Sequence, residues 1–474
     1  MTSRGRRNDE SRRDFLEQIG FGAGAISLFG AGFLSVAREA SAQACAPPGP
    51  PGTAKAWRRD NRPIRQRKAA STLSTAEVQK LRDAYKAMRD LSASDPADPR
   101  GFAHQANVHC WNCGGIGSTI QVHGSWQFFA WHRAYLYFHE RILGKLIGDM
   151  EFRLPYWDWD VPAHRKLPPA YATPGDASNP LWNGTRFMGA NDEVPEEDVG
   201  TDVMDAVLTA ADFSDFGGTA TSSGIPEGAP HGAVHVDVGG DMGAFGTAGK
   251  DPIFYSHHAN VDKVWSDWNK GSSTHDNPEA SAFLNLRFRF FDENKVWRSI
   301  SAARVLDHES KLRYSYGPSI ESDVLPRLLE WVEVQPPRPV QRTVAIDARL
   351  RETLAKAATS GAQVRIHFDG LQVPVDKSAV YSVYADVREA EAARGAQSPA
   401  FIGVVPVVLN DKDNRHPTPP ERRAVFNVTK RLAQLLERQA PLEFALVERG
   451  PRGEKGRVLP LRARAVHFSV AQVE

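Results

Sequence analysis

The sequence has few of the features that a disulfide-rich or strongly charged protein would need. Only three cysteines occur among 474 residues, which excludes a small scaffold held together by disulfides. The 58 basic and 57 acidic residues leave a formal net charge of +1, so composition does not indicate nucleic acid or any strongly charged partner. The hydrophobic fraction of 41% and the chain length are ordinary for a globular protein of two or three domains.

The first 42 residues have the pattern of an export signal. Arg12 and Arg13 precede a glycine-rich apolar run at 19–36, and Ala40-Ser41-Ala42 is a typical cleavage site. Paired arginines in this position are typical of signals for the twin-arginine translocon, so we expect the chain to be exported and to be periplasmic or secreted. A membrane anchor is the alternative, but the glycines disfavour it, and we expect no stable membrane association after signal removal.

The remaining chain divides into three parts by composition. Residues 43–333 show helical periodicity and are expected to form the catalytic domain, and the proline-rich stretch 334–340 reads as a linker. Residues 341–474 contain short alternating or β-branched runs, which predict a β-sandwich-like domain with one helix from Pro420 through Leu436. The predicted strands are Gln363–Phe368, Ala379–Ala385, Phe401–Leu409, Leu442–Val447 and Ala463–Val470.

Three helices of the catalytic part have clear local signals. Ser74 and Glu77 form a capping box that opens a helix over Thr75–Leu91. A strongly apolar helix is expected over Ser125–Leu146, and Asp251-Pro252 marks the start of another.

Histidines are concentrated in one part of the chain, since ten of the fifteen lie between His104 and His258. His231 and His235 are four residues apart, which puts both on one face of a helix. His257 and His258 are adjacent and point about 100° apart on a helix, so we expect only His258 to reach an ion shared with that pair.

His123 and His132 can bind the same metal ion only if the helix is broken between them. His123 and His132 are nine residues apart and would point about 180° apart on one continuous helix. We therefore expect His123 to lie on a loop, with Gly124 making the break. His109 is expected in a cysteine-bearing loop, His109–Cys113.

Two long stretches around these histidines resemble a known family. The segment His123–Glu140, with Phe128-Phe129-Ala130-Trp131-His132-Arg133, resembles the first copper signature of tyrosinases, catechol oxidases and haemocyanins. The segment Asp251–Asp262, with Ile253-Phe254-Tyr255-Ser256-His257-His258, resembles the second, and Gln105–Cys113 is similar to plant polyphenol oxidases. The resemblance covers most of residues 62–318.

The resemblance implies a mainly α catalytic domain, a four-helix bundle holding two copper ions, followed by the C-terminal β-rich domain as a shield. It makes His109, His123 and His132 ligands of the first copper, and His231, His235 and His258 ligands of the second. Imidazole is a suitable ligand for copper. His257 is then expected to pack against the ligands, and the histidines expected to be structural are His104, His139 and His164.

The resemblance also implies roles for the cysteines. Cys113 matches the position that forms a thioether with a copper histidine, here His123, and Cys45 is then expected to form a disulfide with Cys110. A redox or zinc motif at Cys110-x2-Cys113 is the alternative, but a second cysteine pair is missing from the sequence.

Further positions match residues around the copper pair. Glu227 lies where the family carries a glutamate that assists in deprotonating a phenol, and Phe245 lies where a gate residue stands over the second copper. Tyr314-Ser315-Tyr316 resembles the motif that closes the catalytic domain, with Arg65 or Arg67 as its partner.

The resemblance implies a copper-dependent oxidoreductase that acts on a small phenol with O2. Gly232 stands where enzymes that hydroxylate monophenols often carry asparagine, which favours a catechol oxidase making o-quinones. A tyrosinase that also hydroxylates monophenols is the first alternative. A haemocyanin-like oxygen carrier is the second, because the same six histidines serve both functions.

Overall fold

The computed structural model describes residues 44–317, apart from 60 and 116, and residues 332–472 with several breaks. The breaks are 335–337, 341–342, 345, 376, 393–394, 409–421, 438–440 and 450–454. The predicted export signal and the middle of the predicted linker lie outside the described residues. Within the described ranges, no helix has the length and apolar character that a membrane crossing requires.

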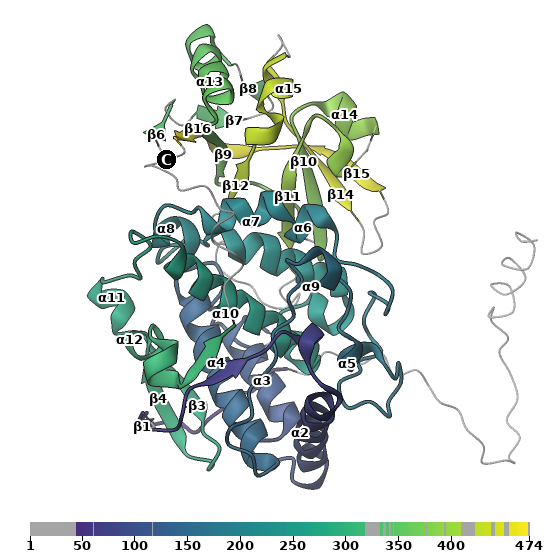
Figure 1. The fold of residues 1–474 in the computed structure, drawn as a ribbon, viewed down its shortest axis with the longest axis vertical. Coiled ribbons are helices and arrows are strands. Elements are labelled where there is room, and N and C mark those ends of the chain that lie inside the picture. Colours follow the sequence, from purple (N-terminus) through teal and green to yellow (C-terminus); the bar gives the residue numbers. More distant parts are fainter. Residues whose placement is uncertain are drawn as a thin grey trace, which may run out of the picture. The chain divides into compact units, whose positions relative to one another are not determined.

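The first part of the chain is built around four long helices (Figure 1). These are α2 Thr75–Ser94, α3 Phe102–Asn112, α4 Gln127–Leu146 and α10 Ile253–Gly271. Short helices complete it: α5 Pro169–Ala172, α6 Glu196–Val199, α7 Thr201–Leu208, α8 Phe213–Phe216, α9 Ala233–Val238, α11 Ser281–Leu284 and α12 Ala302–Val305. Its strands are β1 Lys55–Ala56, β2 Arg65–Arg67, β3 Arg287–Phe291, β4 Trp297–Ser301 and β5 Tyr314–Tyr316.

The three predicted helices are confirmed as α2, α4 and α10. Ser74 accepts a hydrogen bond from the Glu77 amide while the Glu77 carboxylate accepts from the Ser74 amide, so the capping box is present. The Asp251 carboxylate accepts from the amide of Ile253 at 3.0 Å, which satisfies one free N–H at the start of α10.

The expectation of a loop at His109–Cys113 is wrong, because α3 contains this segment up to Asn112. Phe102, Val108 and Cys110 are all buried, and they lie on different sides of the helix. A helix buried on several sides has no alternation of polar and apolar residues at the helical period, so the sequence pattern did not indicate it.

The C-terminal part forms two larger antiparallel sheets and a two-stranded one made by β13 and β8. The first has the order β11-β10-β14-β15, and the second has the order β12-β9-β16-β6 with β7 also paired to β16. The strands are β6 Val332–Glu333, β7 Arg338–Val340, β8 Thr343–Val344, β9 Gln363–Asp369, β10 Ala379–Tyr384, β11 Phe401–Val407, β12 Arg423–Asn427, β13 Leu442–Glu443, β14 Ala445–Arg449, β15 Lys455–Pro460 and β16 Ala463–Ala471. The helices are α13 Ala348–Ser360, α14 Val387–Ala392 and α15 Leu432–Glu437.

The two sheets pack face to face, as expected for a sandwich. One apolar cluster joins Ile366 and Phe368 of β9 with Val383 of β10 and Val405 of β11. Four of the five predicted strands are present as β9, β10, β11 and β16, whereas the predicted strand Leu442–Val447 is divided at Phe444 into β13 and β14, which belong to different sheets. The predicted helix from Pro420 is wrong in its first half, since Arg423–Asn427 pairs with β9 and the helix α15 begins only at Leu432.

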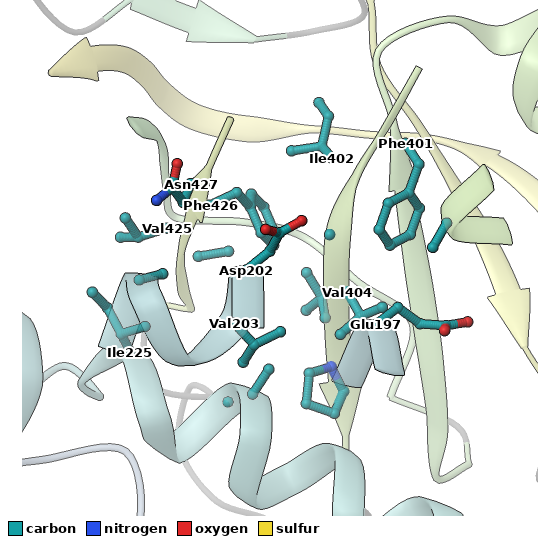
Figure 2. A pocket seen from close by; sticks show the side chains of 18 of the residues that line it. Glu197, Asp202, Val203, Ile225, Phe401, Ile402, Val404, Val425, Phe426 and Asn427 are labelled. Atoms are coloured by element: carbon teal, nitrogen blue, oxygen red, sulfur yellow. The ribbon is translucent and has the colours of Figure 1, made fainter. Parts of the chain in front are cut away.

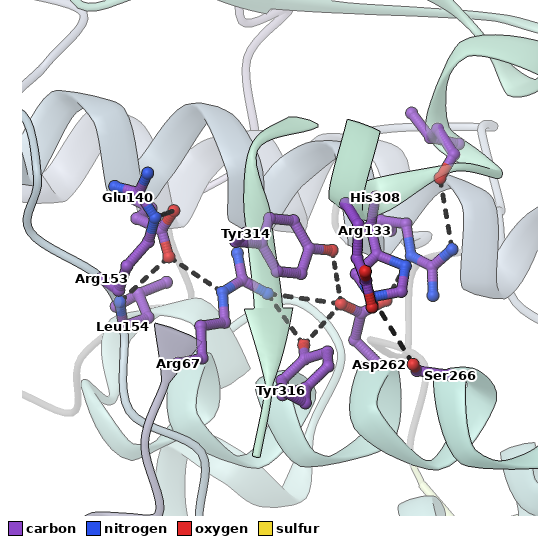
Figure 3. A network of polar contacts seen from close by, with 12 residues as sticks. Arg67, Arg133, Glu140, Arg153, Leu154, Asp262, Ser266, His308, Tyr314 and Tyr316 are labelled. Atoms are coloured by element: carbon purple, nitrogen blue, oxygen red, sulfur yellow. Dashed lines mark hydrogen bonds and ion pairs between the residues drawn. The ribbon is translucent and has the colours of Figure 1, made fainter. Parts of the chain in front are cut away.

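A buried carboxylate, Asp262, joins α10 to α4 and to β5 (Figure 3). It accepts hydrogen bonds from Arg133 at 2.5 Å, Tyr314 at 2.6 Å and Tyr316 at 2.5 Å, and Arg67 lies 3.3 Å away. Burial alone would raise the pKa of Asp262, but Arg133 and Arg67 outweigh it and lower the pKa to about 2. Asp262 is therefore ionised at neutral pH.

Of the two arginines proposed to partner the tyrosine motif, the structure selects Arg67. Its guanidinium donates to Tyr316 at 2.9 Å, lies 3.7 Å from the Tyr314 ring centre and pairs with Glu140 at 2.8 Å. Arg65 instead pairs with Glu151 at the surface.

Removing the Arg67 guanidinium leaves buried carboxylates under-paired, so Arg67→Ala is expected to lower the free energy of unfolding by about 3–5 kcal/mol. The matched change Arg65→Ala breaks an exposed pair and should cost less than about 1 kcal/mol. Guanidinium denaturation of the metal-free variants measures both values. Equal losses would contradict the buried network.

Candidate metal centre

Three histidines and a cysteine converge inside the helical part. His109 lies on α3, His123 on the loop before α4 and His132 on α4, while Cys113 follows α3. One ligand atom from each of the four lies within 4.8 Å of the others, and all four residues are buried. Gly124 has φ of +73°, which makes the break expected between His123 and α4.

Four histidines form the second group: His231, His235, His257 and His258. His231 lies in the π-helical turn Glu227–Gly232, His235 follows on α9, and the other two lie in the first turns of α10. Their ligand atoms also lie within 4.8 Å of one another.

Oxygen acceptors orient five of the six predicted ligands through Nδ1. The acceptors are the Phe245 carbonyl for His109 at 2.9 Å, the Gln121 amide oxygen for His123 at 2.9 Å, the Phe128 carbonyl for His132 at 2.8 Å, the Glu227 carbonyl for His231 at 2.9 Å and the Met242 carbonyl for His235 at 2.8 Å. An imidazole that donates from Nδ1 keeps the lone pair of Nε2 free for a metal.

The free nitrogens of both groups fit metal ions. The buried Nε2 atoms of His109, His123, His132 and His231 have no hydrogen-bond partner among the described residues. The Nε2 atoms of His235 and His258 lie only 3.3 Å apart. Buried polar atoms are normally paired, so this set of unpaired nitrogens fits ions held between the imidazoles. Histidine-only ligation is suited to copper among the common transition metals.

Burial lowers the pKa of all six predicted ligands, and neighbouring imidazoles lower it further for several. The pKa falls to about 3 for His132 and to about 4 for His235. The imidazoles are therefore neutral at pH 7, which is the state that binds a metal.

The two groups lie side by side. The rings of His132 and His258 stack with centres 4.2 Å apart and planes 9° apart. Phe254 contacts both groups, with its ring centre 4.6 Å from that of His109 and 4.2 Å from that of His258. The arrangement is a single centre for two adjacent ions. Phe254 was not singled out from the sequence, although its position one helical turn before His258 is a usable signal.

His257 was expected to pack against the ligands without reaching their ion, but the structure brings one of its ring nitrogens within 4.8 Å of the ligand atoms of His231, His235 and His258. Trp159 donates to its Nδ1 at 3.1 Å, while its Nε2 is buried without a partner among the described residues. The ring nitrogens of a histidine lie well beyond its Cβ atom. Two adjacent histidines that point 100° apart on a helix can therefore still direct ring nitrogens toward the same metal position.

Phe245 was expected over the second copper, but its ring stacks on His123 of the first group, with centres 4.2 Å apart. The Phe245 carbonyl accepts the hydrogen bond from His109, and this bond holds the residue beside the first group. The structure therefore corrects the placement of this residue.

Glu227 reaches the centre from the π-helical turn. One carboxylate oxygen accepts from the Gly124 amide, and the other is buried without a partner among the described residues. Burial raises the pKa of Glu227 to about 8, against the lowering effects of the Gly124 N–H and the Arg422 charge.

The structure contains the Cys45–Cys110 disulfide, and Cys113 is a buried free thiol. The three histidines expected to be structural lie outside both groups. His139 stacks on Tyr255 with ring centres 3.6 Å apart, and the other two contact Phe291 (His104) and Asp158 (His164).

The fold and the paired histidine groups define a dinuclear copper protein of the type 3 class. A family model described as the common central domain of tyrosinase matches residues 98–199 and 182–271, and one described as the polyphenol oxidase middle domain matches 277–336. The chain belongs to the tyrosinase and polyphenol oxidase family.

Individual relatives agree with this assignment. Tomato (Solanum lycopersicum) polyphenol oxidase A, chloroplastic, is 34% identical, with 53% of this chain and 46% of the relative covered. The structure of grape (Vitis vinifera, Grenache) polyphenol oxidase is 33% identical with a TM-score of 0.51, covering 59% of this chain and 94% of that one. Latent apple tyrosinase is 25% identical with a TM-score of 0.64, covering 89% and 100%. The chain spans about half the length of the curated relatives it matches.

Glu227→Gln should change how the stability of the metal-free protein depends on pH. The folded pKa of about 8 lies above the ordinary 4.5, so the stabilising contribution of the protonated carboxyl is complete below pH 4.5 and is lost as the pH rises through 8. Relative to the variant, the wild type should lose about 3 kcal/mol of unfolding free energy between pH 5 and pH 8.

Urea denaturation of metal-free wild type and variant at both pH values measures this difference. Glu196→Gln, at a side chain that is 72% exposed, is the control and should show no such trend. A constant difference between Glu227→Gln and wild type would contradict the burial of this carboxyl.

Proposed function

We propose that this protein is a polyphenol oxidase that converts two catechols and one O2 into two o-quinones and two water molecules. The observation that carries the proposal is the set of buried, neutral imidazoles whose unpaired nitrogens meet at two adjacent positions. A copper pair held there supplies O2 binding and two-electron oxidation. The names of the relatives, which include polyphenol oxidases and a catechol oxidase, support this substrate class.

The proposed ligands are His109, His123 and His132 for one copper and His231, His235 and His258 for the other. Glu227 is proposed as the group that takes the phenolic proton, because its unpartnered oxygen is buried beside the histidine groups. Copper bound nearby favours the carboxylate form that a base requires. The Phe245 ring, stacked on His123, is proposed to contact the phenol on entry.

One covalent bond belongs to the same proposal. We infer a thioether between Cys113 and His123, which the position of the thiol within the first group supports.

The export signal is a separate part of the proposal. Residues 1–42 are proposed to direct export by the twin-arginine translocon to an oxidising compartment, where the Cys45–Cys110 disulfide persists. The tomato relative, which is described as chloroplastic, is likewise a protein of a specific compartment.

Catechol oxidation is favoured over monophenol hydroxylation by the surroundings of Gly232. A Cβ atom at this position would lie 3.0 Å from Cγ of Pro406, so the close approach of β11 favours glycine. Glycine has no polar side chain that could help Glu227 orient a monophenol. An asparagine at this position would be in close steric contact with Pro406.

Oxygen uptake by the copper-loaded chain on 4-methylcatechol and on p-cresol tests the proposal. We expect the initial rate on the catechol to exceed that on p-cresol by at least about tenfold. The two substrates differ by one hydroxyl, so restricted access to the copper pair lowers both rates alike. The ratio of the two rates therefore compares catechol oxidation with monophenol hydroxylation.

Comparable rates on both substrates would identify a tyrosinase that hydroxylates monophenols. Reversible O2 binding with negligible turnover of either substrate would identify an oxygen carrier instead. Matched samples without added copper provide the background rate.

We also propose that residues 341–474 shield the copper pair. Ser378 donates to the Gly243 carbonyl near Phe245, and Pro406 packs on Gly232 next to His231, so the C-terminal part contacts two segments beside the histidine groups. All six predicted ligands are at most 6% exposed, so a phenol must displace part of the protein to reach them. Structural relatives that cover about nine-tenths of this chain are described as latent, which supports this role.

The contact between the two parts is incompletely packed. A cavity of about 400 Å³ lies between α6, α7 and strands β11 and β12, with Val203, Val404 and Phe426 among its lining residues (Figure 2). Two ion pairs cross beside it, Arg423 with Asp215 at 2.6 Å and Lys430 with Asp202 at 2.6 Å. These pairs are suitable points at which to loosen the shield.

Arg423→Ala combined with Lys430→Ala should raise kcat/KM for 4-methylcatechol about three- to tenfold, because each partly exposed pair contributes up to about 1 kcal/mol to holding the shield closed. The control is Lys356→Ala with Arg388→Ala, which breaks pairs within the C-terminal part. Unchanged turnover in the first double variant would count against shielding.

A further inference from the structure

The second histidine group contains one imidazole more than the three ligands proposed for its copper. His257 lies among His231, His235 and His258, and the ligand atoms of the four residues are within 4.8 Å of one another. Its ring stacks on that of His231 with centres 5.4 Å apart, and its ring centre lies 4.9 Å from that of His235. Distance alone therefore does not separate the ligands from the fourth histidine.

The hydrogen bonds of the rings do separate them. Nδ1 of His231 and Nδ1 of His235 each face a carbonyl oxygen, which can only accept, so Nδ1 carries the proton and Nε2 keeps its lone pair. His257 has the opposite arrangement, because the indole Nε1 of Trp159, which can only donate, lies 3.1 Å from its Nδ1. Nδ1 of His257 is therefore an unprotonated acceptor, and the ring proton is on Nε2.

This tautomer leaves His257 without a lone pair for a metal. The lone pair of Nδ1 accepts the hydrogen bond from Trp159, and Nε2 carries the proton. The Nε2 atom is buried and has no hydrogen-bond partner among the described residues, so nothing in that part of the chain draws the proton away. His257 therefore lies beside the second copper position without being able to bind the ion.

Trp159 is fixed in the position from which it donates. Its side chain is fully buried. The segment that carries it is joined to the first two turns of α10 by two hydrogen bonds: the Trp157 amide donates to the Ser256 carbonyl at 3.0 Å, and the Asn260 side chain donates to Asp160 at 2.8 Å. The indole N–H thus keeps its place relative to the helix that carries His257.

We propose that Trp159 is a positioning residue that keeps His257 off the second copper, so that one coordination position of this ion stays open for the phenol. This inference rests on the proposed copper pair. Zinc enzymes show the general rule that a catalytic metal keeps one position for substrate, whereas a metal closed off by four protein ligands serves structure. Three imidazoles leave such a position on the second copper, and a fourth would occupy it.

Two tryptophans of one segment provide a matched pair of variants. Trp159→Phe removes the N–H and keeps an aromatic ring, so that His257 has a nitrogen lone pair available to the metal. Trp157→Phe is the control, because this indole is also fully buried but donates to the His164 carbonyl at 3.0 Å, outside both histidine groups. Each change removes one buried indole hydrogen bond.

The experiment measures, on copper-loaded full-length protein, how much chelator removes each copper and how tightly azide, a small anion that binds an open copper position, is held. In Trp159→Phe, one of the two coppers should need at least about tenfold more chelator to leave, and azide should bind at least about tenfold more weakly. Trp159→Phe/His257→Leu should return both values to the wild-type range. Trp157→Phe should match wild type.

A second comparison does not depend on the folding of the tryptophan variants. His257→Leu removes an imidazole that is proposed not to bind copper, and His235→Leu removes one that is. His257→Leu should therefore keep both coppers at chelator concentrations that wild type withstands, whereas His235→Leu should lose one of them.

Three results would overturn the proposal: copper retention in Trp159→Phe no greater than in wild type, persistence of its tighter copper binding in Trp159→Phe/His257→Leu, or loss of one copper from His257→Leu. Failure of the wild type to bind two coppers would instead overturn the proposed function, and the role of Trp159 with it.

Discussion

The hydrogen bond from Nδ1 to a fixed oxygen, made by five of the six proposed ligand imidazoles, is the interaction on which the metal centre depends. The acceptors belong to Gln121, Phe128, Glu227, Met242 and Phe245, which lie on different segments of the chain. Each bond sets the tautomer and the ring direction, so that Nε2 stays unprotonated and points inward. Burial keeps the rings neutral, because an imidazolium in this volume would be neither solvated nor paired.

The ionic network around Asp262 supports this arrangement from behind. Asp262 lies one turn beyond His258 on α10, and Arg133 follows His132 directly on α4. Their contact at 2.5 Å therefore joins the two ligand-bearing helices close to the ligands themselves. Buried pairs of this kind add little net stability compared with apolar packing, but losing one partner is costly, so they favour one register of the helices.

The C-terminal part has two relations to the centre. It contacts loops beside the histidine groups, as a shield requires, and its apolar side chains also join Ala233 and Val236 of α9 in one buried cluster. The cavity and the ion pairs lie beside β12 and α7.

The sequence by itself determined the helices α2, α4 and α10 and four of the five predicted C-terminal strands, because caps and alternation are local properties. The six proposed ligands came from the resemblance of two segments to the copper signatures of the family. Tertiary structure alone decided that α3 is helical, since a segment buried on several sides shows no periodicity. It also decided that Arg67 partners the tyrosines, that His257 joins the second group and that Phe245 lies on His123. Each of these outcomes depends on which residues of a distant segment the fold brings next to the side chain. The spacing of residues along the chain carries no information about such contacts.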